Sequence, residues 1–461
     1  MKSSSIYGYF TLLACVGILF FSCATKPEVY GGIDQAVDKN EFAAAVEALK
    51  KGQEGKKPIY PEKNAVSLRL DKGLLEHYAG NYAESSQDLQ EAERLIQEAF
   101  TKSVTQEFTS YIANDNTKEY PGEDYEDIYL NIFNALNYYN KGDVDGAMVE
   151  IRKITLSSGK LDMLSRKYEE GQKSAGDGAM AALKKLGFNI NPDLPQGDPM
   201  QFSDSALARY LGALFYQAQG NADSARIEFA RIPTAFSSNP KVYKNPIPAV
   251  VAGVQNIPQG QAPLHVIGFT GLSPIKEEQE FKQYFPFFQN EILRNQKFAL
   301  PVLKARPDSI DRIEVIVEGH DGRGTFQLEL LEDMAAVAAE TYNARFANIF
   351  FKTYIRTMLK YAASDIAATA SNKAGGTAGA IGGLVASVGG KIAADASESA
   401  DIRMSRFFPA KAYVGGIGLV PGTYHITINY YSGGSHVGKD ERKDFVVKAN
   451  TPNIIETVNL K

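Results

Sequence analysis

The N-terminal half of the sequence repeats one pattern, two amphipathic helices joined by a short turn, and this pattern constrains the fold most. The clearest unit spans residues 124–154. Apolar side chains recur at helical spacing in its first helix: Ile128, Ile132, Ala135 and Leu136. Gly142 is placed to end that helix, and Asp143 to cap the next. The small side chains of Ala135 and Ala147 let two such helices approach closely. We therefore predict helix pairs.

The same pattern returns along the chain, and its small, aromatic and turn residues resemble those of tetratricopeptide repeats. A second copy centres on Gly220, a weaker one on Gly80 and a faint one on Asn40. These turns are spaced irregularly and more widely than the about 34 residues of a regular array. The resemblance implies three or four irregular units, interrupted by insertions and stacked as an α-solenoid over residues 33–235. A generic helical bundle is the alternative.

Stacks of this kind hold peptides or proteins on a concave face, which is formed by the first helix of each pair. The resemblance implies that this face carries a partner groove lined by Tyr129, Ile132, Leu136, Tyr139, Tyr210 and Gln217. The same side chains also suit packing between neighbouring helices, so the pattern leaves both interpretations open.

The C-terminal half has a different pattern. Residues 236–263 are rich in Pro, Asn and Gln and are predicted to be a linker. Residues 264–461 are predicted to form a mixed α/β domain with a hairpin around residues 319–324, a long helix over 332–370 and a β-rich end over 411–461. The expected class is a multidomain α+β protein, in which an irregular TPR-like solenoid precedes a mixed strand and helix domain.

A glycine-rich segment, residues 373–391, follows the long helix. It is not a phosphate-binding loop, because Lys391 is followed by Ile392 where such loops carry Ser or Thr. It is also short and weakly hydrophobic for a membrane span. A closely packed hairpin or a loop is the expectation, with self-association at a membrane as a further hypothesis.

The N-terminus has the layout of a secretory signal. An apolar run over residues 6–21 is too short for a typical transmembrane helix and is followed by small residues. The stretch ending in Ser22–Cys23 resembles a lipobox, which implies a signal peptide over 1–22, lipid on Cys23 and a tether over 23–32. Cys15 is an alternative lipidation site, and an uncleaved anchor or a plain signal is another. Ala24, by resemblance to enteric sorting, favours the outer membrane over the inner.

Few residues in the remaining sequence suggest chemistry. Both cysteines of the chain lie in the leader, so the mature protein has neither a disulfide nor a Cys-based metal site. The five histidines are scattered, and no catalytic, metal or cofactor motif is found. The net charge is −5 and no basic run suggests nucleic-acid binding.

Several stretches together resemble a family of uncharacterised bacterial lipoproteins with tetratricopeptide-like N-terminal halves. These are residues 125–154, 271–276, 332–338 and 400–424; Met404 departs from a Trp-containing pattern expected there. Members of the family occur beside lipoprotein activators of peptidoglycan synthases. The resemblance implies a membrane-anchored envelope scaffold that binds proteins, in cell-wall or outer-membrane assembly. The alternative is an envelope enzyme acting on glycan or peptide, with a site between the halves near His320 and Asp321.

Overall fold

The computed structural model describes residues 30–105, 118–156, 159–164, 202–253, 257–284, 295–320, 322–373 and 399–461. The predicted signal peptide, Cys23, most of the tether, Asp321 and residues 374–391 of the glycine-rich segment lie outside these residues. In the described part, no helix is both long and apolar enough to cross a membrane.

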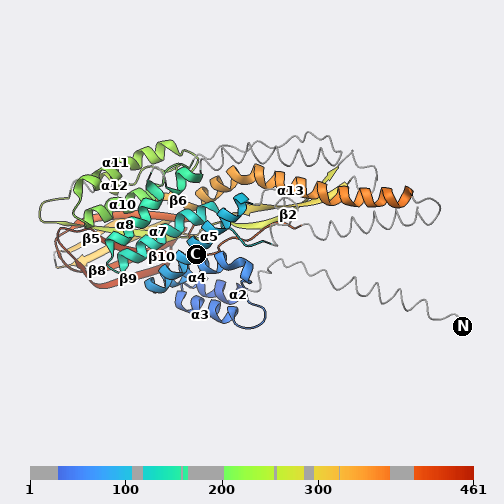
Figure 1. Cartoon of the computed structure of the whole chain (residues 1–461). Helices are drawn as coiled ribbons and strands as arrows, with labels where there is room; N and C mark the ends of the chain where they lie inside the picture. Colours follow the sequence, from blue (N-terminus) through green and yellow to red (C-terminus); the bar gives the residue numbers. More distant parts are fainter. Residues whose placement is uncertain are drawn as a thin grey trace.

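Four helical hairpins lie in the described part of the N-terminal half, and helix pairs are what the sequence predicts there. They are α2 (Gly31–Asp38) with α3 (Phe42–Gln53), α4 (Ala65–Tyr78) with α5 (Tyr82–Thr105), α7 (Asp124–Asn140) with α8 (Val144–Thr155), and α10 (Ala206–Ala218) with α11 (Ala222–Ser238). A single 3-10 turn, η2 (Glu62–Asn64), precedes α4. The hairpins pack against one another in chain order (Figure 1).

All four hairpins turn in the same way. The central residue of each three-residue turn has a positive φ: Asn40 (57°), Gly80 (82°), Gly142 (82°) and Gly220 (75°). This left-handed conformation suits glycine, and asparagine tolerates it better than most residues. The residue after it directly precedes the next helix; Asp143, for example, is the N-cap of α8, and its carboxylate accepts from the Gly146 N–H at 2.8 Å. The predicted turn and cap residues are thus confirmed.

The strands of the C-terminal half form two four-stranded sheets and a ribbon. The first sheet has the order β10 (Asn453–Asn459), β1 (Ala262–Thr270), β7 (Lys411–Leu419), β6 (Glu329–Asp333). The second has the order β5 (Gly322–Gln327), β4 (Arg312–Gly319), β8 (Gly422–Ser432), β9 (Ser435–Val447). The hairpin predicted around residues 319–324 is β4–β5.

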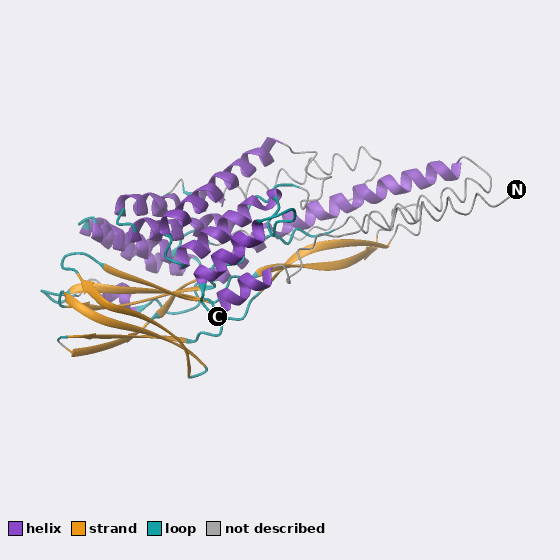
Figure 2. Ribbon diagram, turned by 90° about the horizontal axis from the view of Figure 1, so that it is seen from below, coloured by secondary structure: helices purple, strands orange, loops and turns teal. Residues whose placement is uncertain are grey.

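The first sheet is the middle of three layers, between the helices and the second sheet (Figure 2). Alternation along β1 produces this arrangement. Leu264 and Val266 pack toward the second sheet, whereas Ile267 and Phe269 belong to the core shared with the helices. That core continues from Tyr30 to Leu460. The mixed α+β class is confirmed, and the two halves share one hydrophobic core.

An arm extends from this body (Figure 1). It contains α13 (Met334–Lys373) and the antiparallel ribbon of β2 (Ile275–Tyr284) and β3 (Asn295–Lys304). The rings of Phe298 and Phe350 meet edge to face at 5.8 Å, and the Tyr342 hydroxyl donates to the Pro301 carbonyl. The long helix is close to its predicted bounds, whereas the ribbon was not predicted. Within the predicted linker lie the end of α11 and the short α12 (Ala249–Gly253).

Candidate functional site

The first helices α4, α7 and α10 lie on the inner face of the helical layer, but there they pack against strands of the first sheet, which cover that face. Of the six residues predicted to line a partner groove, Tyr129, Ile132, Leu136 and Tyr210 are at most 1% exposed. Tyr139 and Gln217 are half-buried, and the Tyr139 hydroxyl donates to the Pro452 carbonyl at 3.3 Å. A separate partner reaches this face only if the C-terminal half moves away.

Glu332 is the strongest polar link between the two halves. Its carboxylate, which is fully buried, accepts hydrogen bonds from the Tyr129 hydroxyl at 2.6 Å, the Tyr243 hydroxyl at 2.7 Å and the Leu207 N–H at 3.0 Å. Ser205, the N-cap of α10, donates to it as well. Burial raises the pKa of Glu332, and these four donors oppose the rise.

Two further buried carboxylates hold the segment that precedes β7. Asp71 on α4 accepts from the Ser405 hydroxyl at 2.6 Å and the Arg406 N–H at 2.7 Å. Glu126 on α7 accepts from the Ser405 N–H at 2.5 Å. Burial, followed by the charge of Glu123, raises the pKa of Glu126 to about 8. The backbone of Ser405 and Arg406 therefore binds to α4 and α7, at the inner face where such repeats usually bind a separate peptide.

The histidines divide between this interface and the surface. His77 on α4 contacts the Glu456 carboxylate at 2.6 Å and Asn137 at 2.7 Å. His265 on β1 contacts the Tyr210 hydroxyl at 2.8 Å, and burial lowers its pKa to about 3. His320, near which the alternative enzyme site was expected, is exposed in the β4–β5 turn. The buried pair therefore serves the packing of the halves.

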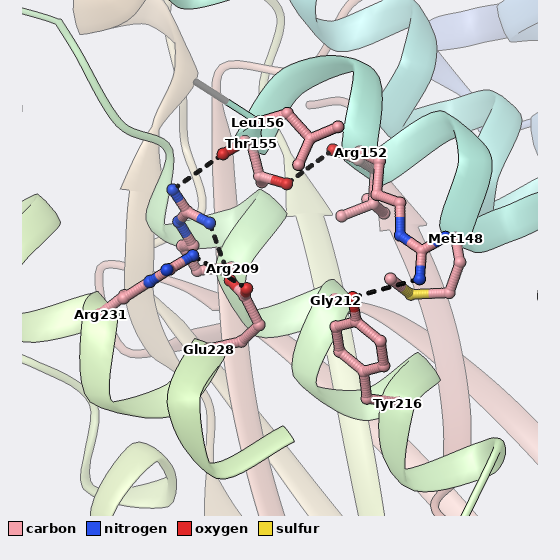
Figure 3. Close-up of a pocket in the computed structure, with 10 residues that line it drawn as sticks. Met148, Arg152, Thr155, Leu156, Arg209, Gly212, Tyr216, Glu228 and Arg231 are labelled. Atoms are coloured by element: carbon pink, nitrogen blue, oxygen red, sulfur yellow. Dashed lines mark hydrogen bonds and ion pairs between the residues drawn. The ribbon is translucent and has the colours of Figure 1, made fainter. Parts of the chain in front are cut away.

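The outer side of the last two hairpins holds a small cavity of about 40 Å³ (Figure 3). Residues of three helices line it: Met148, Ile151, Arg152, Thr155 and Leu156 from α8 and its end, Arg209, Gly212 and Tyr216 from α10, and Glu228 and Arg231 from α11. Gly212 allows the close approach of α10 to α8, because a Cβ there would lie 3.2 Å from the Ile151 Cγ2 atom.

Three arginines and one glutamate set the charge of this cavity. Glu228 binds Arg209 at 2.9 Å and Arg231 at 3.2 Å. Arg209 also donates to the Thr155 carbonyl and pairs with Asp204. Arg152 donates to the Tyr216 hydroxyl at 3.2 Å and has no ion pair with any described residue (Figure 3). Among the lining residues, positive charge therefore exceeds negative charge.

One exposed apolar side chain lines the same cavity, and two others share a helix face with residues that line it. Leu156 is 55% exposed and lines it. Val149 and Ile227 are also exposed; Val149 shares a helix face with Arg152, and Ile227 shares one with Arg231. We call the cavity with Val149, Leu156 and Ile227 the outer groove. It was not predicted, although apolar residues on the polar face of an amphipathic helix were a signal for it.

In the described residues, no group of three or more His, Cys, Asp and Glu side chains is arranged to hold a metal ion. The outer groove and the covered inner face are therefore the features that bear on function. Comparison with known proteins adds nothing to them, since no family model, no curated protein and no solved structure matches the chain.

Proposed function

We propose that this protein is a lipoprotein of the bacterial cell envelope, anchored through lipid on Cys23, that acts as a scaffold for partner proteins. The layout of the leader and the lipobox-like stretch before Cys23 support the anchor. The stretches that resemble the lipoprotein family described above support a role in cell-wall or outer-membrane assembly. Ala24 favours the outer membrane.

Four helical hairpins with one turn geometry, packed in chain order, support a TPR-like solenoid as the scaffold. Such stacks usually bind partners on the inner face, but here that face is covered by the first sheet. Partners would therefore bind on the outside. The observation that carries this proposal is the outer groove, where apolar side chains and an arginine without an ion pair among the described residues lie together.

The anchor is tested by comparing wild type with Cys23→Ala and Cys15→Ala in cells that receive a clickable fatty acid. We expect label on wild type and Cys15→Ala, and none on Cys23→Ala, which should leave the membrane fraction. Label on Cys23→Ala, or its full retention in the membrane, would refute lipidation at Cys23 and point to Cys15 or an uncleaved leader.

The scaffold role is tested with a photo-crosslinking amino acid placed at Leu156, and at Val446 as a control. Val446, on β9 of the second sheet, is 54% exposed, which matches the 55% of Leu156. We expect discrete crosslinked protein adducts in living cells from position 156 and none of the same size from position 446. Identical adducts from both positions, or none from position 156, would contradict a docking role for the outer groove.

A further inference from the structure

We infer that the outer groove binds a partner segment in which a carboxylate side chain lies beside a branched apolar one. This inference rests on the proposed scaffold role and adds the chemistry of the partner. It requires the groove to prefer acidic over basic segments and to need an apolar contact as well.

The charge of the groove favours an acidic partner. Glu228 is already bound by both Arg209 and Arg231, so the groove has no spare carboxylate to attract a cation. The Arg152 guanidinium has only the Tyr216 hydroxyl as a described hydrogen-bond acceptor and retains further N–H donors. A carboxylate is the acceptor that a guanidinium binds best, because two parallel hydrogen bonds form between the planar groups.

The apolar part of the groove lies next to that guanidinium. Leu156 directly follows the last residue of α8, four residues after Arg152, and the buried Met148 and Ile151 line the cavity beside them. Covering the exposed Leu156 side chain would remove apolar surface from water and so stabilise a complex. A free anion would leave this apolar surface exposed to water. The groove therefore suits a peptide segment better than an inorganic anion.

The test uses three short fluorescent peptides and the mature protein. One peptide presents Glu and Leu on one helical face, the second has Lys in place of each Glu, and the third has Ser in place of each Leu. By fluorescence anisotropy, the Glu/Leu peptide should bind at least about tenfold more tightly than either of the others. Its affinity should also fall as salt is added, because an exposed ion pair is screened.

Arg152→Glu and Leu156→Ser should each weaken binding of the Glu/Leu peptide by about tenfold or more. The matched controls are Arg323→Glu on β5 and Val446→Ser on β9, both exposed and distant from the groove, and they should leave binding unchanged. Thermal unfolding of all four variants should match wild type, because each replaced side chain is at the surface.

The inference is overturned if the Lys/Leu peptide binds as tightly as the Glu/Leu peptide, or if Arg152→Glu leaves binding unchanged. It is also overturned if the mature protein dimerises through this face. In that case, light scattering would show a dimer that Arg152→Glu dissociates. These outcomes leave the anchored scaffold intact, because that proposal is tested by fatty-acid labelling and by crosslinking from position 156.

Discussion

The carboxylate of Glu332, on the middle sheet, accepts a hydrogen bond from the backbone N–H of Leu207 in the first turn of α10, at 3.0 Å. An anion at a helix N-terminus is stabilised by the unpaired N–H groups and by the helix dipole. Here, the anion belongs to the C-terminal half and the helix to the N-terminal half. The two halves thus complete each other's hydrogen bonding as well as their core.

Replacing Glu332 by Gln should lower the free energy of unfolding by about 2–4 kcal/mol, because its amide group would face a buried donor. Urea unfolding measures this loss. Glu329→Gln is the control, since Glu329 accepts from the Ala249 N–H at an exposed position; it should cost less than about 1 kcal/mol. Equal losses in the two variants would mean that Glu332 adds nothing beyond an ordinary surface contact.

The raised pKa of Glu126 predicts a pH dependence of stability. Its pKa is about 8 in the folded protein, whereas an ordinary glutamate side chain has a pKa of 4.5. Between these values the folded state keeps a proton that the unfolded state has lost. The contribution of Glu126 to the free energy of unfolding is therefore fully present below pH 4.5 and is lost as the pH rises to about 8.

Unfolding free energies of wild type and Glu126→Gln, measured from pH 5 to 8, test this sign. The wild-type value should fall with pH by about 1–4 kcal/mol more than that of the variant. The variant should be less stable throughout, because its amide would meet the Ser405 N–H. Parallel curves would show that Glu126 does not titrate in this range.

Glu456 raises the pKa of His77. Burial lowers the pKa of His77, but the charge of Glu456 and the hydrogen bonds that His77 makes to Glu456 and to the Asn137 side-chain oxygen outweigh burial and raise the pKa overall. The contribution of His77 to the free energy of unfolding is thus present below about pH 6.5 and is lost as the pH rises through the pKa that His77 has in the folded protein. In Glu456→Gln, the His77 pKa should fall below its wild-type value when followed by NMR. The control is Glu441→Gln on β9 of the second sheet, which should leave the His77 titration unchanged.

The four turns offer a test of backbone conformation. Gly142→Ala should lower the free energy of unfolding by about 1 kcal/mol, because alanine at φ 82° is strained.

Asn40 also has a positive φ, so Asn40→Gly should relieve backbone strain. We nevertheless expect urea unfolding to show a net loss of about 1 kcal/mol. The Asn40 side chain donates to Asn459 at 3.2 Å and accepts from the Leu460 N–H at 3.2 Å, and both bonds would be lost. A gain in stability would show that these contacts are weak.

The helical hairpins could be predicted because each carries its own signals. Helical spacing, a turn residue such as Gly142 and a cap such as Asp143 all lie within one short stretch. The β2–β3 ribbon was not predictable in this way. β2 reads Ile-Lys-Glu-Glu-Gln-Glu-Phe and has no alternation of apolar and polar residues; its partner strand packs on α13, which lies far along the chain.

The inner face shows why local patterns do not decide between binding and packing. Tyr129 suits a partner groove and a buried core equally, and its role is set by Glu332 about two hundred residues later. The outer groove likewise forms from residues that are distant in the sequence and meet only in the folded protein. Arg152, Arg209 and Arg231 come from three helices, and their sequence spacing gives no sign that they lie around one cavity.

The position of the middle sheet also governs the order in which the chain can fold. The helices are synthesised first, but Phe133 and Tyr210 on their inner face pack against Phe269 and His265 of β1, and β1 pairs in parallel with β10. A growing chain therefore keeps an apolar helix surface uncovered until β1 has been made, and the first sheet that covers it is complete only with β10. Such long-range pairing slows folding and exposes the nascent chain to aggregation. We expect prolonged chaperone occupancy on the N-terminal half during synthesis.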